Sequence, residues 1–174
     1  DTTGTVEFSD TLTLTTGLGT AAQDYAVSIL GNATIAGATS FSNTGALTLG
    51  DGGTETIAFT GGVTATDVSG ITVGALAVTS AGVTGIALGG ADTNVSVTQT
   101  GTFGGTGTGT IDIGDITLSD GKTLTIGTGI ANTVNLDAVT GTADGGAEDL
   151  TINTTGVVTV AEAVGTVPLG TILI

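Results

Sequence analysis

The side chains that could do chemistry in this chain are almost all carboxylates. Sixteen acidic residues stand against one cation, Lys122, and the sequence holds no histidine and no cysteine. Calcium is bound in proteins by several carboxylate and carbonyl oxygens that converge on one point. Two close pairs could begin such a site, Asp112 with Asp115 and Glu148 with Asp149. These four residues are the candidate calcium ligands. The alternative interpretation is that carboxylates placed in turns only keep the surface soluble, and then no cofactor is expected.

The same inventory of side chains argues against an enzyme. Nucleophilic catalysis by a triad needs a histidine base or a cysteine thiolate, and neither residue type is present. Glycoside hydrolysis needs two carboxyl groups about 5 to 10 Å apart, and normally aromatic or basic side chains that hold the sugar. With four phenylalanines, one tyrosine and one lysine, the chain is poor in both. We therefore predict a protein without enzymatic activity.

The net charge of −15 excludes several classes of partner. Nucleic acids and anionic membrane surfaces are bound by clusters of lysine and arginine, which this chain lacks. No apolar run approaches the ~20 residues that a membrane helix needs, so we expect no membrane insertion. The absence of cysteine means that backbone hydrogen bonds and burial must hold the fold. Because the sequence does not begin with methionine, we expect a processed chain or one unit of a longer chain or polymer.

Short strands are the elements that must position these residues. Polar and apolar residues alternate with period two in many short runs, whereas glycine interrupts nearly every window in which a helix could form. One domain, residues 1–174, is expected. The predicted strands are residues 5–8, 11–15, 25–30, 46–49, 56–59, 71–78, 94–97, 110–113, 116–118, 123–126, 133–136, 150–152, 157–160 and 171–174.

Two stretches of the chain are related to each other. Residues 47–57 read LTLGDGGTETI, and residues 116–126 read ITLSDGKTLTI. Each reads as strand, Asp-Gly turn, strand, a pattern that predicts a hairpin or a corner. The glycine-rich segment 101–109 lacks the ending of a phosphate loop, and we expect a flexible corner or loop there. Loose repeats of short strands are typical of solenoids.

We therefore predict an all-β fold, a β-solenoid (β-helix) rod. Small branched side chains would stack on like residues in neighbouring coils, about 4.8 Å apart. With roughly 20 residues assumed for each coil, about eight coils would be formed. The alternative is an immunoglobulin-like β-sandwich of about seven strands, a fold that commonly contains a core tryptophan and a tyrosine corner. This chain has no tryptophan, and Tyr25 stands too early for that corner.

Four passages carry a resemblance to a known family: DYAV at 24–27, ATSFSNTGALTLGDG at 38–52, IAFTGGVTAT at 57–66 and VGTVPLGTILI at 164–174. They resemble the β-strand repeats of giant bacterial surface proteins, the filamentous-haemagglutinin-like adhesins. The resemblance implies a right-handed β-helical rod that is secreted to the bacterial cell surface or beyond. It further implies service as a stalk, adhesin or matrix.

From these observations we expect a structural subunit of an extracellular bacterial filament or surface stalk. Both ends of the chain look like uncapped strands, which invite pairing with another copy, head to tail. The residues expected to carry this self-assembly are Val6, Phe8, Leu12, Leu14, Leu169, Ile172, Leu173 and Ile174. The alternative is an adhesin repeat module that binds a carbohydrate or a host surface. Stacking on surface glycans would then fall to the aromatic residues Phe8, Tyr25, Phe41, Phe59 and Phe103.

Overall fold

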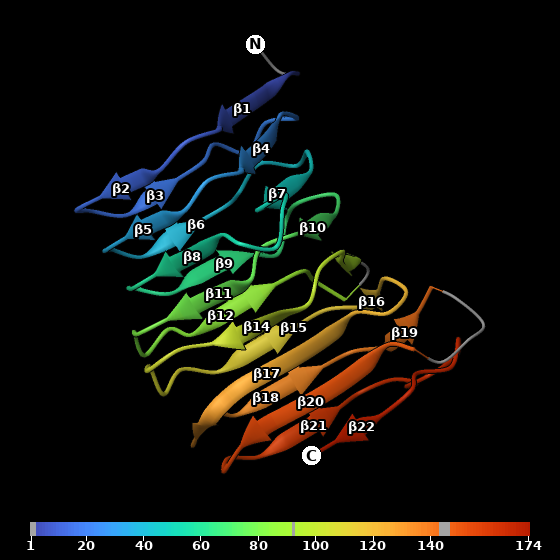
Figure 1. The fold of residues 1–174 in the computed structure, drawn as a ribbon. Coiled ribbons are helices and arrows are strands. Elements are labelled where there is room, and N and C mark those ends of the chain that lie inside the picture. The colour runs from blue at the N-terminus through green and yellow to red at the C-terminus, as the bar shows by residue number, and fades with distance from the viewer. Residues whose placement is uncertain (1–2, 92, 143–146) are drawn as a thin grey trace.

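The chain folds as a β-solenoid of about seven turns (Figure 1). The computed structural model describes residues 3–91, 93–142 and 147–174. Within these ranges it contains strands and no helix. The strands pair with one another in parallel, so the antiparallel sandwich considered as an alternative is wrong.

The strands form three parallel sheets, and each inner coil of the chain contributes one strand to each sheet. Sheet A contains β1 (Thr5–Phe8), β4 (Ala26–Ile29), β7 (Leu47–Leu49), β10 (Ile71–Val73), β13 (Val95–Val97), β16 (Ile116–Leu118) and β19 (Val139–Gly141). Sheet B contains β2 (Leu12–Leu14), β5 (Ala33–Ile35), β8 (Thr56–Phe59), β11 (Ala77–Ser80), β14 (Gly101–Gly104), β17 (Thr123–Ile130), β20 (Asp149–Thr154) and β22 (Ile172–Leu173). Sheet C contains β3 (Leu18–Gly19), β6 (Thr39–Ser40), β9 (Val63–Ala65), β12 (Ile86–Leu88), β15 (Ile111–Ile113), β18 (Val134–Leu136) and β21 (Val158–Val160).

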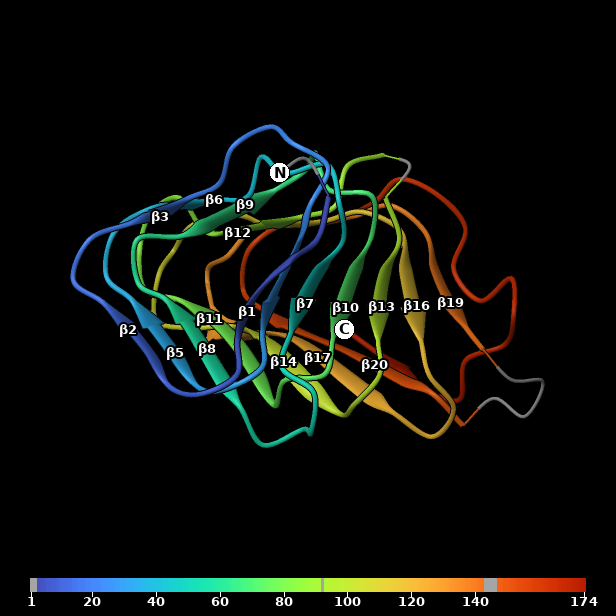
Figure 2. The ribbon, with the colours of Figure 1, turned by 90° about the horizontal axis from the view of Figure 1, so that it is seen from above.

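The core is a narrow column along the axis, enclosed by the three sheets (Figure 2). Successive residues of a strand point to opposite faces, so a strand of three residues can direct two side chains inward and one outward. In sheet A, Leu47 and Leu49 are fully buried, while Thr48 between them faces outward. The chain passes from sheet A to B, to C and back to A. We call these connections the A–B, B–C and C–A corners.

The coils differ in length, and their lengths explain the repeat seen in the sequence. In sheet A, Leu47 pairs with Ile71, Ile71 with Val95, and Val95 with Ile116. The two related stretches, which begin at Leu47 and Ile116, therefore lie three coils apart. The coil length assumed from the sequence was too short, which is why about seven turns are formed rather than eight.

The Asp-Gly stretches form corners and not hairpins. Strand β7 before the first Asp-Gly pair belongs to sheet A, and β8 after it belongs to sheet B. The second stretch joins β16 to β17 in the same way. Gly50 and Gly121 have φ angles of +73° and +67° in these two corners, a backbone conformation that glycine adopts at little cost.

Two predicted elements are corrected by the structure. Residues 71–78, expected as one strand, are β10 and β11 with the A–B corner between them, because Gly74 and Ala75 let the chain bend against the coil before. Segment 101–109, expected as a flexible loop, begins with strand β14. This strand pairs with β11 and β17, and the buried Phe103 fixes it to the core.

Candidate functional site

The two ends of the solenoid are the places where its three sheets stop. At one end β1, β2 and β3 are the outermost strands of sheets A, B and C. At the other end the outermost strands are β19, β22 and β21. We call the surface of residues 5–19 the N-terminal face and that of residues 158–174 the C-terminal face. Strands at the end of a sheet pair on one side only, and their outward N–H and C=O groups form an edge that another strand can join.

The N-terminal face exposes side chains that belong to the core columns. Val6 is 45% exposed, while Phe8, Leu12 and Leu14 are partly buried and pack on the core. A depression of about 390 Å³ beside this face is lined by Val6, Tyr25 and residues 3–5. The four assembly residues predicted for this end therefore lie together on one end of the rod: Val6, Phe8, Leu12 and Leu14.

The C-terminal face carries the other four predicted residues. Ile172, Leu173 and Ile174 are 48%, 60% and 76% exposed, and Leu169 is partly buried against the core. Strand β22 is held on sheet B by the bond from the Leu150 N–H to the Thr171 carbonyl, 2.9 Å. The apolar strand is therefore fixed in place but covered on one side only.

Sheet A also continues beyond β19 at this end. Val164 forms a parallel bridge with Val139, and the Gly165 N–H donates to the Val139 carbonyl over 2.8 Å. The hydroxyl oxygens of Thr140 and Thr166 lie 3.0 Å apart, and the Val167 N–H donates to Thr140 Oγ1 over the same distance. The stacking of the inner coils thus extends to residue 167.

Four further residues belong to the end faces although the sequence analysis did not name them as assembly residues. Leu18 lies on the N-terminal face, and Val158, Val160 and Val164 lie on the C-terminal face. Each pairs with a residue one coil away, as Leu18 does with Thr39. The two related stretches lie three coils apart, so one third of the separation between them is close to the length of a coil. Pairing residues at that spacing could have found these four.

The four candidate calcium ligands do not converge. Asp112 is exposed on the outer face of sheet C, whereas Asp115 lies at the start of the next coil and accepts the Ala138 N–H over 3.2 Å. Glu148 is fully buried, and its two carboxylate oxygens accept the N–H groups of residues 142 and 147, each at 3.1 Å. Asp149 accepts the N–H of residue 171 over 2.7 Å. Three of the four carboxylates are thus engaged by backbone N–H groups, and in the described ranges no three acidic side chains gather as metal ligands would.

One carboxylate in an A–B corner has a displaced pKa. Desolvation acts to raise the pKa of Glu55, but hydrogen bonds from the Thr54 hydroxyl and from the Gly52 and Thr54 N–H groups outweigh it. The net result lowers the pKa of Glu55 from 4.5 to about 2. Like Glu148, this carboxylate holds a corner together.

Most of the aromatic residues are unavailable for stacking on a sugar. Phe41, Phe59 and Phe103 are at most 1% exposed, and the rings of Phe41 and Phe59 meet edge to face with centroids 6.2 Å apart. Tyr25 is partly buried, and its hydroxyl accepts the Ala21 N–H. The expectation that all five aromatics could serve a glycan site is therefore wrong for three of them.

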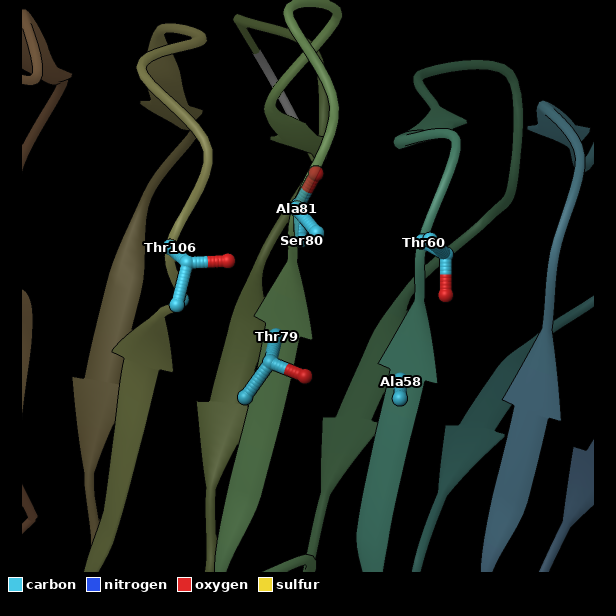
Figure 3. A pocket seen from close by; sticks show the side chains of 7 residues that line it. Ala58, Thr60, Thr79, Ser80, Ala81 and Thr106 are labelled. Atoms are coloured by element: carbon cyan, nitrogen blue, oxygen red, sulfur yellow. The ribbon is translucent and has the colours of Figure 1, made fainter.

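The side of the rod holds a shallow depression of about 230 Å³ on sheet B (Figure 3). Residues of three neighbouring coils surround it: Ala58 and Thr60, then Thr79, Ser80 and Ala81, then Gly105 and Thr106. Its lining residues are small and uncharged.

Comparison with known proteins gives no family for this chain. A scan against protein-family models and searches of curated proteins and of solved structures found no match. A search of the described ranges for a helix long and apolar enough to cross a membrane found none. The function is therefore inferred from the two end faces themselves.

Proposed function

We propose that this protein is a structural rod that assembles head to tail, as a subunit of an extracellular bacterial filament or surface stalk. One observation carries the proposal: the apolar columns of the core reach both ends of the rod and are left partly exposed there. Val6 and Ile172 represent the two ends, with exposed fractions of 45% and 48%. In a solenoid such side chains are covered by a cap or by a neighbouring coil, and a second copy stacked on the end supplies such a coil.

The end faces are also compatible with each other in hydrogen bonding. The edges at both ends are parallel strands of the same three sheets. A neighbouring copy stacked in the same direction continues these ladders, and its first coil covers the exposed side chains of the last. Strand addition of this kind joins backbone hydrogen bonds with the burial of alternate side chains. The contact joins unlike ends, so it propagates into a filament rather than closing into a dimer.

The amino-acid composition suits a structural rod outside the cell. Backbone ladders supply the cohesion, and the chain has no cysteine or methionine that oxidation could damage. The extracellular location and the bacterial origin are part of the proposal. Its support is this composition and the resemblance to surface adhesins.

Blocking one end at a time tests the proposal. Val6→Asp places a charge on the N-terminal face, and Ile172→Asp places one on the C-terminal face. Each variant alone should fail to form filaments in negative-stain micrographs, because every end-to-end contact needs both faces. An equimolar mixture should form end-to-end pairs and no longer rods, since only one end-to-end contact remains. Sedimentation velocity measures these species.

Thr72→Asp is the matched control, because Thr72 is exposed on the outer face of sheet A in an inner coil. This variant should polymerise like the wild type. Deleting residues 171–174 should also abolish filaments while leaving the circular dichroism spectrum of a β fold. The proposal fails if the wild type stays monomeric at millimolar concentration, or if both blocked variants still form filaments.

A further inference from the structure

Among the described residues, the charges that lie at corners are confined to two of the three corners. At the A–B corner lie Asp10, Asp51, Glu55, Asp120, Lys122 and Glu148. At the C–A corner lie Asp24, Asp67, Asp115, Asp137 and Glu162. Both of these corners border sheet A, so the side of the rod that carries sheet A is strongly acidic.

The B–C corner carries no charged residue. It consists of the seven connections 15–17, 36–38, 60–62, 81–85, 105–110, 131–133 and 155–157. Every residue of these connections is described, and each is Gly, Ala, Thr, Val or Asn. The strands that flank this corner add two carboxylates, Asp112 in β15 and Asp149 in β20. A chain with a net charge of −15 thus keeps the corner itself neutral along the length of the rod.

This neutral corner also presents the most exposed large apolar side chain of the described chain. Val83, in the connection between β11 and β12, is 86% exposed. Val157, in the last connection of the same corner, is 66% exposed. The 230 Å³ depression begins at Ala81, two residues before Val83, and extends over the outer face of sheet B (Figure 3). An apolar projection and an uncharged hollow therefore lie side by side.

We infer that the B–C corner is a pairing surface for a second copy of this chain, related to the first by a two-fold axis. Val83 and the central strand of the depression both belong to the fourth of the seven coils, at the middle of the rod. When the two-fold axis passes through the fourth coil, the neutral corners of the two copies meet over their whole length. It also places each Val83 beside the hollow of the partner copy, the reciprocal contact that two-fold symmetry requires.

Electrostatics selects this corner over the other two. Charges repel within about 8 Å at physiological ionic strength. Rods that met through sheet A would bring their acidic corners within that range, whereas rods that meet through the B–C corner keep them on the far sides. The neutral corner is about 34 Å long at ~4.8 Å for each coil. Its narrowness puts the contact at the low end of interface sizes, so we expect weak pairing.

Chemical crosslinking tests the pairing directly, because the chain has no cysteine of its own. In a Val83→Cys variant, a bis-maleimide should join two copies, since both residues 83 lie close to the axis. Thr72→Cys, in the same coil but on sheet A, is the control and should give little crosslinked dimer. End-to-end contacts cannot produce the Val83→Cys crosslink, because they separate residues 83 of successive copies by a whole rod length.

A second measurement keeps lateral pairing separate from head-to-tail assembly. In the Ile172→Asp background, which blocks end-to-end growth, sedimentation equilibrium should show a weak dimer that strengthens from 50 to 500 mM NaCl as the acidic sides are screened. Adding Val83→Glu should weaken this dimer at least tenfold, whereas adding Thr72→Glu should not. Equal crosslinking at positions 72 and 83, or an unchanged dimer after Val83→Glu, would overturn the inference. Neither result would affect the proposed filament.

Discussion

The inner coils and the end coils of the rod use the same kinds of residue with different results. Val6 and Val27 occupy one column of sheet A, one coil apart, yet their exposed fractions are 45% and 1%. At the other end Val164 is 38% exposed and its bridge partner Val139 is fully buried. A side chain in a solenoid is buried by the coils on both sides of it, so its position along the rod determines how much it is buried and how much it stabilises the fold.

This difference has a consequence for dynamics. A coil in the middle gains from two stacking contacts, and an end coil gains from one. The end coils should therefore open at a smaller cost in free energy than the middle, which native-state hydrogen exchange measures as lower protection. Assembly would remove the difference, because every end coil would then acquire its second neighbour.

Removing a phenylalanine ring from each region should give the largest contrast. Phe103→Ala empties a site that is 1% exposed, and we expect a loss of about 3–5 kcal/mol in the free energy of unfolding. Phe8→Ala removes a partly buried ring from the N-terminal face, where solvent can fill the gap, and we expect roughly half that loss. Urea denaturation at low protein concentration measures both. Equal losses would contradict the contrast between inner and end coils.

A pair of glycine substitutions should sharpen the contrast at intermediate size. Gly85 and Gly165 have similar φ angles, +79° and +77°, so alanine at either position is strained by about 1–2 kcal/mol. At Gly85 the new methyl group would also collide with the Thr110 carbonyl of the next coil, while at Gly165 it would meet nothing within 4 Å. Overpacking adds about 1–3 kcal/mol to the cost at Gly85 alone. In thermal unfolding, Gly85→Ala should have a lower Tm than Gly165→Ala.

Glu55→Gln should give the smallest effect, and one that depends on pH. Since folding lowers the pKa of Glu55 from 4.5 to about 2, its stabilisation is fully present above pH 4.5 and is lost as the pH falls through 2. The variant should therefore be slightly less stable than the wild type at pH 7 and should match it near pH 2. Urea midpoints at pH 7, 4 and 2 test this. A constant difference across the range would show that the carboxylate's ionisation is not involved.

Much of the fold follows from patterns that the sequence displays. The alternation in residues 5–8 and 56–59 predicts β1 and β8 with their bounds, because an apolar core on one face requires period two. At the N-terminal end the predicted assembly residues Val6, Phe8, Leu12 and Leu14 also come from such runs. Strands β6 and β19, with the sequences TS and VTG, were missed because neither contains two apolar residues on either side of a polar one.

The buried asparagines show what only the three-dimensional contacts reveal. Asn43 is fully buried; its amide donates to the Tyr25 and Gly45 carbonyls at 3.0 and 3.2 Å, and its Oδ1 accepts a hydroxyl of the coil before. Asn132 is 3% exposed and donates to the Gly107 and Gly109 carbonyls. Most of these partners lie about one coil away in the sequence, so no local pattern marks either residue as part of the interior.

By itself, the sequence determined that the chain is all-β, acidic, and made of short strands joined by glycine-rich corners, because composition and period-two alternation are local properties. The tertiary structure alone decided which residues stack. Coil lengths vary from one winding to the next, so the register depends on how each corner packs against its neighbour. That stacking separates the acidic corners from the neutral one, and it leaves identical valines buried in the middle of the rod and exposed at its ends.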